Sequence, residues 1–138
     1  MAPFSVRVSS TFEEFWRYNI VVMAAVMREG QRVELLKDRI DVAPVGAELT
    51  APPVGYVSRD VMLRSVPADA LTLYIYVVPH SLPRVESIAM AEAFDLRVEV
   101  MFDDKPLYGH THEINQWSGE NIELSFLQPS QHCDMGRE

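Results

Sequence analysis

Alternation of apolar and polar residues is the dominant pattern of this chain, and it predicts β-strands. The clearest case is residues 94–103, whose even positions are all apolar: Phe94, Leu96, Val98, Val100 and Phe102. A period of two places successive side chains on opposite faces of a strand, so this segment should bury one face. Residues 121–127 and 4–9 repeat the alternation. Three strands with one buried face each are therefore predicted.

Residues 71–78 carry a different pattern, with β-branched and aromatic residues on both faces and Pro79 at the end. This composition is typical of a central strand that is covered on both sides. Tyr74 and Tyr76 then belong to the protein core. A central position in the sheet is predicted for this segment.

Turn residues connect the later segments. Residues 103–106 read Asp-Asp-Lys-Pro, which favours a turn, and residues 107–114 are expected to return as the hairpin partner of 94–103. Residues 118–120 then turn the chain into the last strand. The stretch 43–65 is rich in proline and glycine, and we expect only short strands there, at 46–50 and 61–64.

Residues 11–29 support two interpretations. A capping-box sequence at 10–14, Gly30 as a C-cap and apolar residues at helical spacing indicate an amphipathic helix. The same segment also has a period-two face from Trp16 to Val26, followed by a turn at 28–31 into a second strand at 32–42. Arg17, Tyr18 and the following Asn-Ile-Val-Val run are mediocre helix formers, so the strand is the preferred interpretation.

A short helix is expected within 83–93, where apolar residues follow Pro83 at helical spacing. If this helix is a right-handed crossover, strands 71–78 and 94–102 are parallel and the fold is α+β. If it spans the ends of a sandwich, the two strands lie in different sheets.

Together these segments predict a mainly β fold, an antiparallel β-sandwich of about seven or eight strands, either immunoglobulin-like or C2-like, with one short helix near 83–93. The alternative is an α+β fold with an N-terminal helix at 11–29. At 138 residues the chain has the usual length of one domain, which we assign to 1–127, and residues 128–138 are expected to form a frayed tail.

The charge balance excludes some classes of partner. The chain has 12 basic and 20 acidic residues and a net charge of -8. Such a surface repels phosphate backbones and anionic lipids, so neither nucleic acid nor a membrane is expected as a partner. The chain as given shows no signal peptide, and its longest apolar run, 20–27, is much shorter than the ~20 residues of a membrane-spanning helix. The charge and the apolar runs of the sequence indicate neither the compartment nor the oligomeric state.

His110 and His112 are the leading candidates for metal ligands, because two residues apart on a strand they share a face. The pair is similar to the His-x-His pair on a strand of cupin barrels. In cupins a glutamate follows a few residues later, whereas Glu113 follows at once here and faces the opposite way. A third ligand would come from His80 or Glu120. The alternative interpretation is a half-buried sheet face with ordinary hydrogen-bonded imidazoles.

Two weaker leads concern calcium and protein recognition. Asp60, Asp69, Asp103, Asp104 and Glu120 lie at turns, as calcium ligands of C2 domains do, but without the Asp-x-Asp spacing. Trp117 could anchor a partner if it is exposed.

No catalytic signature stands out. The serines have no Gly-x-Ser-x-Gly context, and the single cysteine, Cys133, lies in the expected tail. We therefore expect a noncatalytic protein-binding or accessory interaction module that uses an edge strand or loop tips, with no cofactor. The alternatives are a divalent-metal protein or metal-dependent enzyme using His110 and His112, and a C2-like domain that binds calcium or a membrane.

Overall fold

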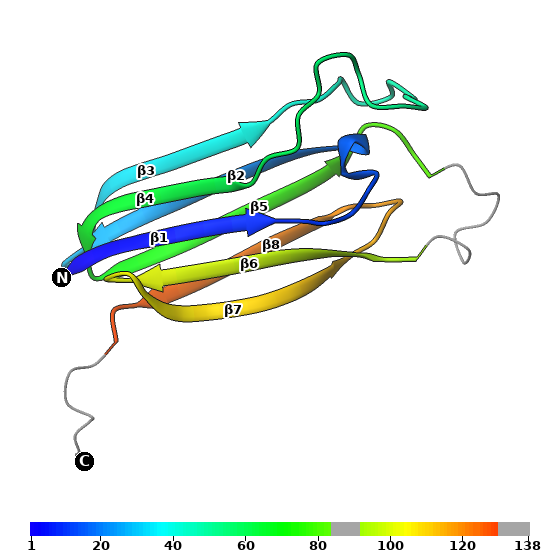
Figure 1. Ribbon diagram of the computed structural model, residues 1–138. Helices are drawn as coiled ribbons and strands as arrows, with labels where there is room; N and C mark the ends of the chain where they lie inside the picture. Colours follow the sequence, from blue (N-terminus) through cyan, green and yellow to red (C-terminus); the bar gives the residue numbers. More distant parts are fainter. Residues whose placement is uncertain (84–91, 130–138) are drawn as a thin grey trace.

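Two four-stranded antiparallel sheets pack face to face in this chain, as the computed structural model of residues 1–83 and 92–129 shows (Figure 1). Sheet I has the order β4-β1-β6-β7, and sheet II has the order β3-β2-β5-β8. The strands are β1 (Ala2–Ser9), β2 (Tyr18–Arg28), β3 (Gln31–Ile40), β4 (Val61–Ala68), β5 (Ala70–Pro79), β6 (Phe94–Phe102), β7 (Lys105–Ile114) and β8 (Glu120–Leu127). The predicted β-sandwich of seven or eight strands is confirmed.

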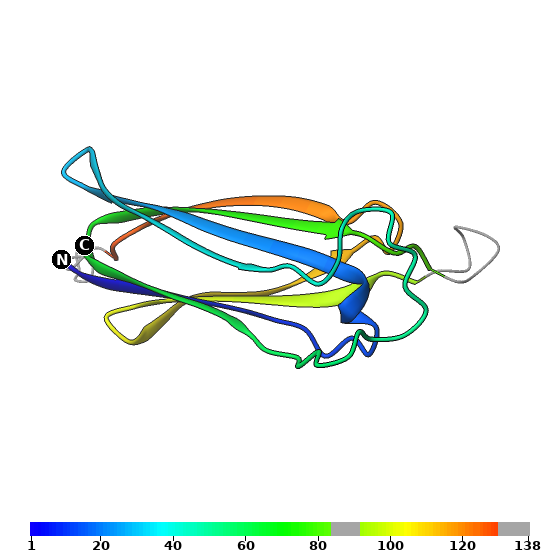
Figure 2. The same ribbon diagram turned by 90° about the horizontal axis from the view of Figure 1, so that it is seen from above.

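The core lies between the two layers that Figure 2 shows from above. Alternate residues of the inner strands supply it, and Val22, Ala24, Leu73, Leu96 and Val98 have no exposed surface. Burying a valine or leucine side chain stabilises the fold by about 2 kcal/mol. The period-two pattern of 94–103 is thus confirmed, because the even positions from Phe94 to Val100 are buried.

The two sides of the sandwich differ. On one side β3 and β4 lie against each other, and Glu34 of β3 accepts a hydrogen bond from the Val66 N–H of β4 at 3.1 Å. On the other side β7 and β8 are the edge strands. There the rings of Tyr108 and Phe126 meet edge to face, with their centroids 5.3 Å apart.

The helical interpretation of 11–29 is wrong, and the preferred strand is confirmed. A single 3-10 turn, η1 (Phe15–Arg17), precedes β2. The inward residues of β2 are buried from Tyr18 to Val26 at every second position. Gly30, with φ +79°, lies in the turn to β3 rather than capping a helix.

Three further expectations need correction. Residues 46–50 form no strand, because the prolines and the positive φ angles of Gly46 and Gly55 keep the loop irregular. The strand expected at 61–64 continues to Ala68, and its Pro67 is tolerated because β4 is an edge strand. β5 is central, between β2 and β8, but only its inner face is covered, so Tyr74 and Tyr76 are half-buried on the outside.

β5 and β6 lie in different sheets, which rules out a parallel crossover between them. Most of the short helix expected at 83–93 falls on residues outside the described part of the chain. The same holds for most of the tail expected at 128–138. Among the described residues, no helix has the length and apolar character needed to cross a membrane.

Candidate functional site

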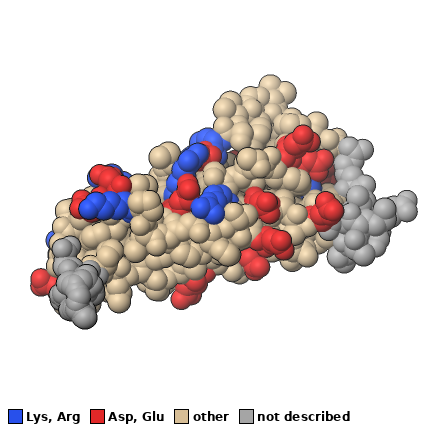
Figure 3. Space-filling view, turned by 60° about the horizontal axis from the view of Figure 1, so that its bottom comes forward, with Lys and Arg blue, Asp and Glu red and all other residues tan. Residues whose placement is uncertain are grey.

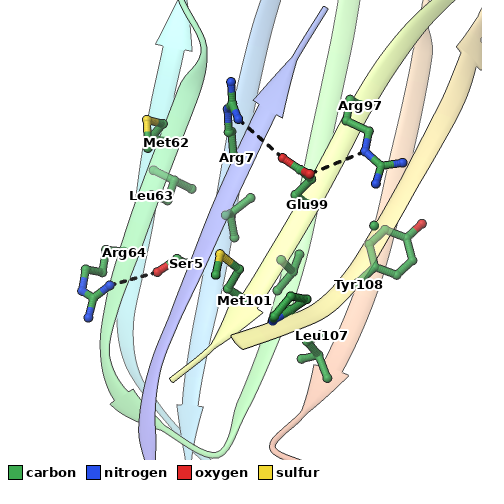
Figure 4. A pocket seen from close by; sticks show the side chains of 14 residues that line it. Ser5, Arg7, Met62, Leu63, Arg64, Arg97, Glu99, Met101, Leu107 and Tyr108 are labelled. Carbon is green, nitrogen blue, oxygen red and sulfur yellow. Dashed lines mark hydrogen bonds and ion pairs between the residues drawn. The ribbon is translucent and has the colours of Figure 1, made fainter. Parts of the chain in front are cut away.

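A groove of about 600 Å³ lies on the outer face of sheet I. All four strands of the sheet contribute to it, and Figure 4 shows its side chains rising from them. Its polar lining is mainly Arg7 of β1, Arg64 of β4, and Arg97 and Glu99 of β6. Its apolar lining includes Met62 and Met101 on the outer face, and the edges of Leu63, Leu107 and Tyr108, whose side chains pack against the core.

The groove is hollow because small residues stand among long ones. Across the strands, Met62 pairs with Arg7, Arg7 with Glu99, and Glu99 with Gly109. Gly109 has no side chain, and the Arg97 guanidinium lies over it, so that a Cβ at Gly109 would be 2.6 Å from Arg97 Nη2. In the neighbouring row the small Ser5 stands between Arg64 and Met101. A flat sheet face thereby acquires a depression with tall rims.

The charged groups of the groove form a chain of exposed ion pairs. Arg7 Nη1 and Arg97 Nε each lie 3.7 Å from a different oxygen of Glu99 (Figure 4). Arg7 also binds Asp60 at 2.7 Å, and this hydrogen bond raises the pKa of Arg7. Arg64 Nη1 reaches Asp104 at 3.0 Å and donates to Ser5 Oγ at 3.2 Å. Basic and acidic atoms accordingly lie side by side on the face in Figure 3.

These pairs hold the arginines only loosely. The side chains of Arg7, Arg64 and Arg97 are each about half exposed, at 53%, 57% and 44%. Exposed ion pairs contribute about 0 to 1 kcal/mol. A ligand can therefore exchange the acidic partners at little cost. The lining of the groove contains three arginines but one carboxylate, that of Glu99, which pairs with Arg7 and Arg97.

His110 and His112 do share one face of a strand, with ring centroids 4.7 Å apart. Their partners across the sheet are Val98 and Leu96, which are fully buried, so the histidines face the space between the sheets. Because β7 is an edge strand, this part of the space between the sheets is open to solvent, and His110 is exposed while His112 is half-buried. Tyr108 Oη lies 3.1 Å from His112 Nε2. Burial lowers the pKa of His112, and the charge of His110 lowers it further.

The suggested third ligands are placed differently. His80 is 2% exposed at the end of β5, and both of its ring nitrogens are used, by the Trp16 carbonyl and by Ser81 Oγ, each at 2.7 Å. Glu120 begins β8 and opposes the lowering of the His112 pKa through its charge. Within residues 1–83 and 92–129, no three His, Cys, Asp or Glu side chains gather closely enough to hold a metal ion. The histidine metal site stays a prediction.

The acidic turn residues do not share one end of the sandwich. Asp60 precedes β4 and Asp69 follows it, so the eight residues of that strand separate them, a distance of roughly 25 Å. Asp69 accepts the backbone N–H of Glu29 at 2.8 Å, and Asp104 is paired with Arg64. Cys133 lies outside the described residues.

Trp117 is half-buried in the turn between β7 and β8, where its backbone N–H is bound by Asn115 Oδ1 at 2.8 Å. Its indole nitrogen is buried and has no hydrogen-bond partner among the described residues. The role of Trp117 as an anchor for a partner stays a prediction.

Sequence reasoning missed the groove. The outward positions of β6, including Arg97, Glu99 and Met101, were visible as the polar face of an alternating strand. What the alternation cannot give is the strand order β4-β1-β6-β7, which brings Arg7 and Arg64 beside them. Comparison with known proteins adds no identification, since no protein family, no curated protein and no solved structure matches this chain significantly.

Proposed function

We propose that this chain is a noncatalytic interaction module that binds an acidic, partly apolar segment of another protein in the groove of sheet I. The observation that carries the proposal is the hollow of about 600 Å³ with three arginines and two methionines in its lining. The proposed recognition surface is thus this groove, whereas an edge strand or loop tips were expected from the sequence.

The lining suits protein recognition. Arginine and methionine are enriched at the centres of protein interfaces, arginine because its planar guanidinium binds carboxylates through two parallel hydrogen bonds. Methionine adapts its flexible thioether to different apolar partners. Met62, which is 68% exposed, forms one wall beside Arg7 and Arg64. An extended segment with alternating carboxylate and apolar side chains would match this arrangement.

Catalysis has little support in the groove. Ser5 is the only serine of the lining, and its hydroxyl accepts a hydrogen bond from Arg64 rather than facing a general base. The two carboxylate oxygens of Glu99 lie in ion pairs with Arg7 and Arg97. The proposal also places the sandwich with immunoglobulin-like or C2-like accessory domains, an analogy of architecture with domains that bind without chemistry.

A direct test uses a fluorescein-labelled octapeptide of alternating glutamate and leucine, with fluorescence anisotropy as the readout. The wild-type protein should bind the peptide, and added salt should weaken binding because it screens the carboxylate–guanidinium attraction. The double variant Arg7→Ala, Arg97→Ala should weaken binding by at least about tenfold, since it removes two of the three guanidinium groups.

The matched control is the double variant Arg32→Ala, Arg39→Ala, which removes two exposed arginines of sheet II and changes the net charge equally. It should bind the peptide like the wild type. A lysine–leucine peptide should not bind. Absence of binding by the wild type, or an equal loss in both double variants, would overturn the proposal.

A further inference from the structure

The outer face of sheet II is apolar in its middle, although it lies on the surface. β2 and β5 fill this middle with Val21, Met23 and Ala25 on one strand and Tyr74 and Tyr76 on the other, all half-buried. Beside them, Leu35 of β3 is 53% exposed and Val78 of β5 is 37% exposed. A contiguous apolar face of this kind marks an interaction surface.

Opposite charges flank the apolar middle in a single row of paired residues. Lys37 of β3 pairs with Met23 of β2, Met23 with Tyr74 of β5, and Tyr74 with Glu123 of β8. Because residues paired across a sheet project to the same side, all four share the outer face. Among the described residues neither Lys37 nor Glu123 has an ion-pair partner.

We propose that this face binds a second copy of the chain through a two-fold axis that runs parallel to the strands between β2 and β5. Such an axis keeps each row at its own height and exchanges its two ends. Lys37 of one copy then faces Glu123 of the other, and Met23 faces Tyr74, twice by symmetry. The surface is self-complementary, as a two-fold interface requires.

The size of the face is adequate for such a dimer. Four strands about 4.8 Å apart and about nine residues long make a face of roughly 19 by 30 Å, or about 600 Å² on each copy. Two copies would bury about 1,200 Å², the lower end of the range for specific interfaces. Two twisted sheets that each tilt about 15° from the axis also reach the crossing angle of about 30° usual for packed sheets.

The test is sedimentation velocity of the full chain over a range of concentrations from low micromolar to submillimolar. The wild type should form dimers. Glu123→Lys places two lysines opposite each other at both ends of the row, and should raise the dissociation constant by at least about tenfold. Lys37→Glu should do the same through facing carboxylates.

The charge-exchanged double variant Lys37→Glu, Glu123→Lys is the decisive control, because it should restore dimers to within about threefold of the wild type. Glu113→Lys and Lys105→Glu make the same charge changes on exposed residues of β7 and should leave the dimer intact. A wild type that stays monomeric throughout, or a double variant as weak as the single variants, would refute the inference. The groove of sheet I lies on the other sheet, so peptide binding there can succeed or fail independently.

Discussion

Gly119 offers the sharpest test of how the sandwich is held together at the turn between β7 and β8. Its φ is +69°, and its N–H donates to the Asn115 carbonyl at 2.9 Å. A Cβ at this position would lie 2.0 Å from the Val77 carbonyl oxygen and 3.0 Å from Pro79 Cδ. The obstacle is therefore the backbone of the central strand β5, which cannot move aside like a flexible side chain.

Gly30 is a matched control, because its φ is +79° and a Cβ there would meet nothing within 4 Å. Alanine at a positive φ costs about 1 kcal/mol at either position, partly offset by the reduced freedom of the unfolded chain. At Gly119 the turn must also withdraw from β5, which adds about 1 to 3 kcal/mol for overpacking. We expect Gly119→Ala to lower the free energy of unfolding by about 3 kcal/mol and Gly30→Ala by about 1 kcal/mol or less.

Urea unfolding of both variants, followed by circular dichroism and tryptophan fluorescence, measures this difference. The fluorescence should also change in the folded Gly119→Ala protein, since Trp117 belongs to the same turn. Equal losses of stability in the two variants would show that the contact with Val77 has no energetic consequence, and the steric reasoning would fail.

Two further predictions concern the buried polar groups near η1. Arg17 is 1% exposed, forms an ion pair with Glu14 at 2.9 Å and stacks on Phe12 and Tyr18. In urea unfolding, Arg17→Ala should therefore lower the free energy of unfolding by about 3 kcal/mol. The control Arg39→Ala, at an exposed arginine, should lower it by less than about 0.5 kcal/mol. His80 has a pKa below its ordinary value because burial disfavours its charged form. Below a pH of about 6.5 the unfolded chain then binds a proton that the folded chain excludes, so the free energy of unfolding should fall as the pH drops through the window between the ordinary and the lowered pKa. His80→Gln should reduce the dependence of the free energy of unfolding on pH, and the lowered pKa of His112 should account for the dependence that is left. Proton NMR titration of the folded protein measures the pKa of each histidine. An ordinary pKa for His80 would contradict this explanation.

The strands that were predicted correctly are those in which one physical requirement dominates. In 94–103 and 121–127 each second residue must enter the core, and the apolar residues stand at those positions. Residues 11–29 were harder because their signals serve two structures. Gly30 supplies a positive φ, which a helix C-cap and a hairpin turn both require. Ser10 Oγ accepts the Phe12 N–H at 3.2 Å, a capping contact that starts only a short turn.

The candidate site could not be predicted, since it depends on which strands become neighbours. Arg7 and Arg97 are far apart in the chain and approach each other through Glu99 because β1 pairs with β6. The shared face of His110 and His112 followed from spacing alone. That this face points toward the space between the sheets, where Tyr108 of the same face meets Phe126, depended on the pairing of β7 with β6.

The one misjudged face of β5 links the sequence to the proposed dimer. Tyr74, Tyr76 and Val78 gave this strand the composition of one covered on both sides, yet the sandwich covers only the face of Leu73 and Ile75. Such residues suit a pleated strand surface in general, but here they adjoin Met23 and Val21 of β2 and form a contiguous apolar face. A second copy packed through the row of Lys37, Met23, Tyr74 and Glu123 would supply the missing cover. Protection of Tyr74 and Tyr76 from solvent should then increase with protein concentration in the wild type, and should not increase in Glu123→Lys.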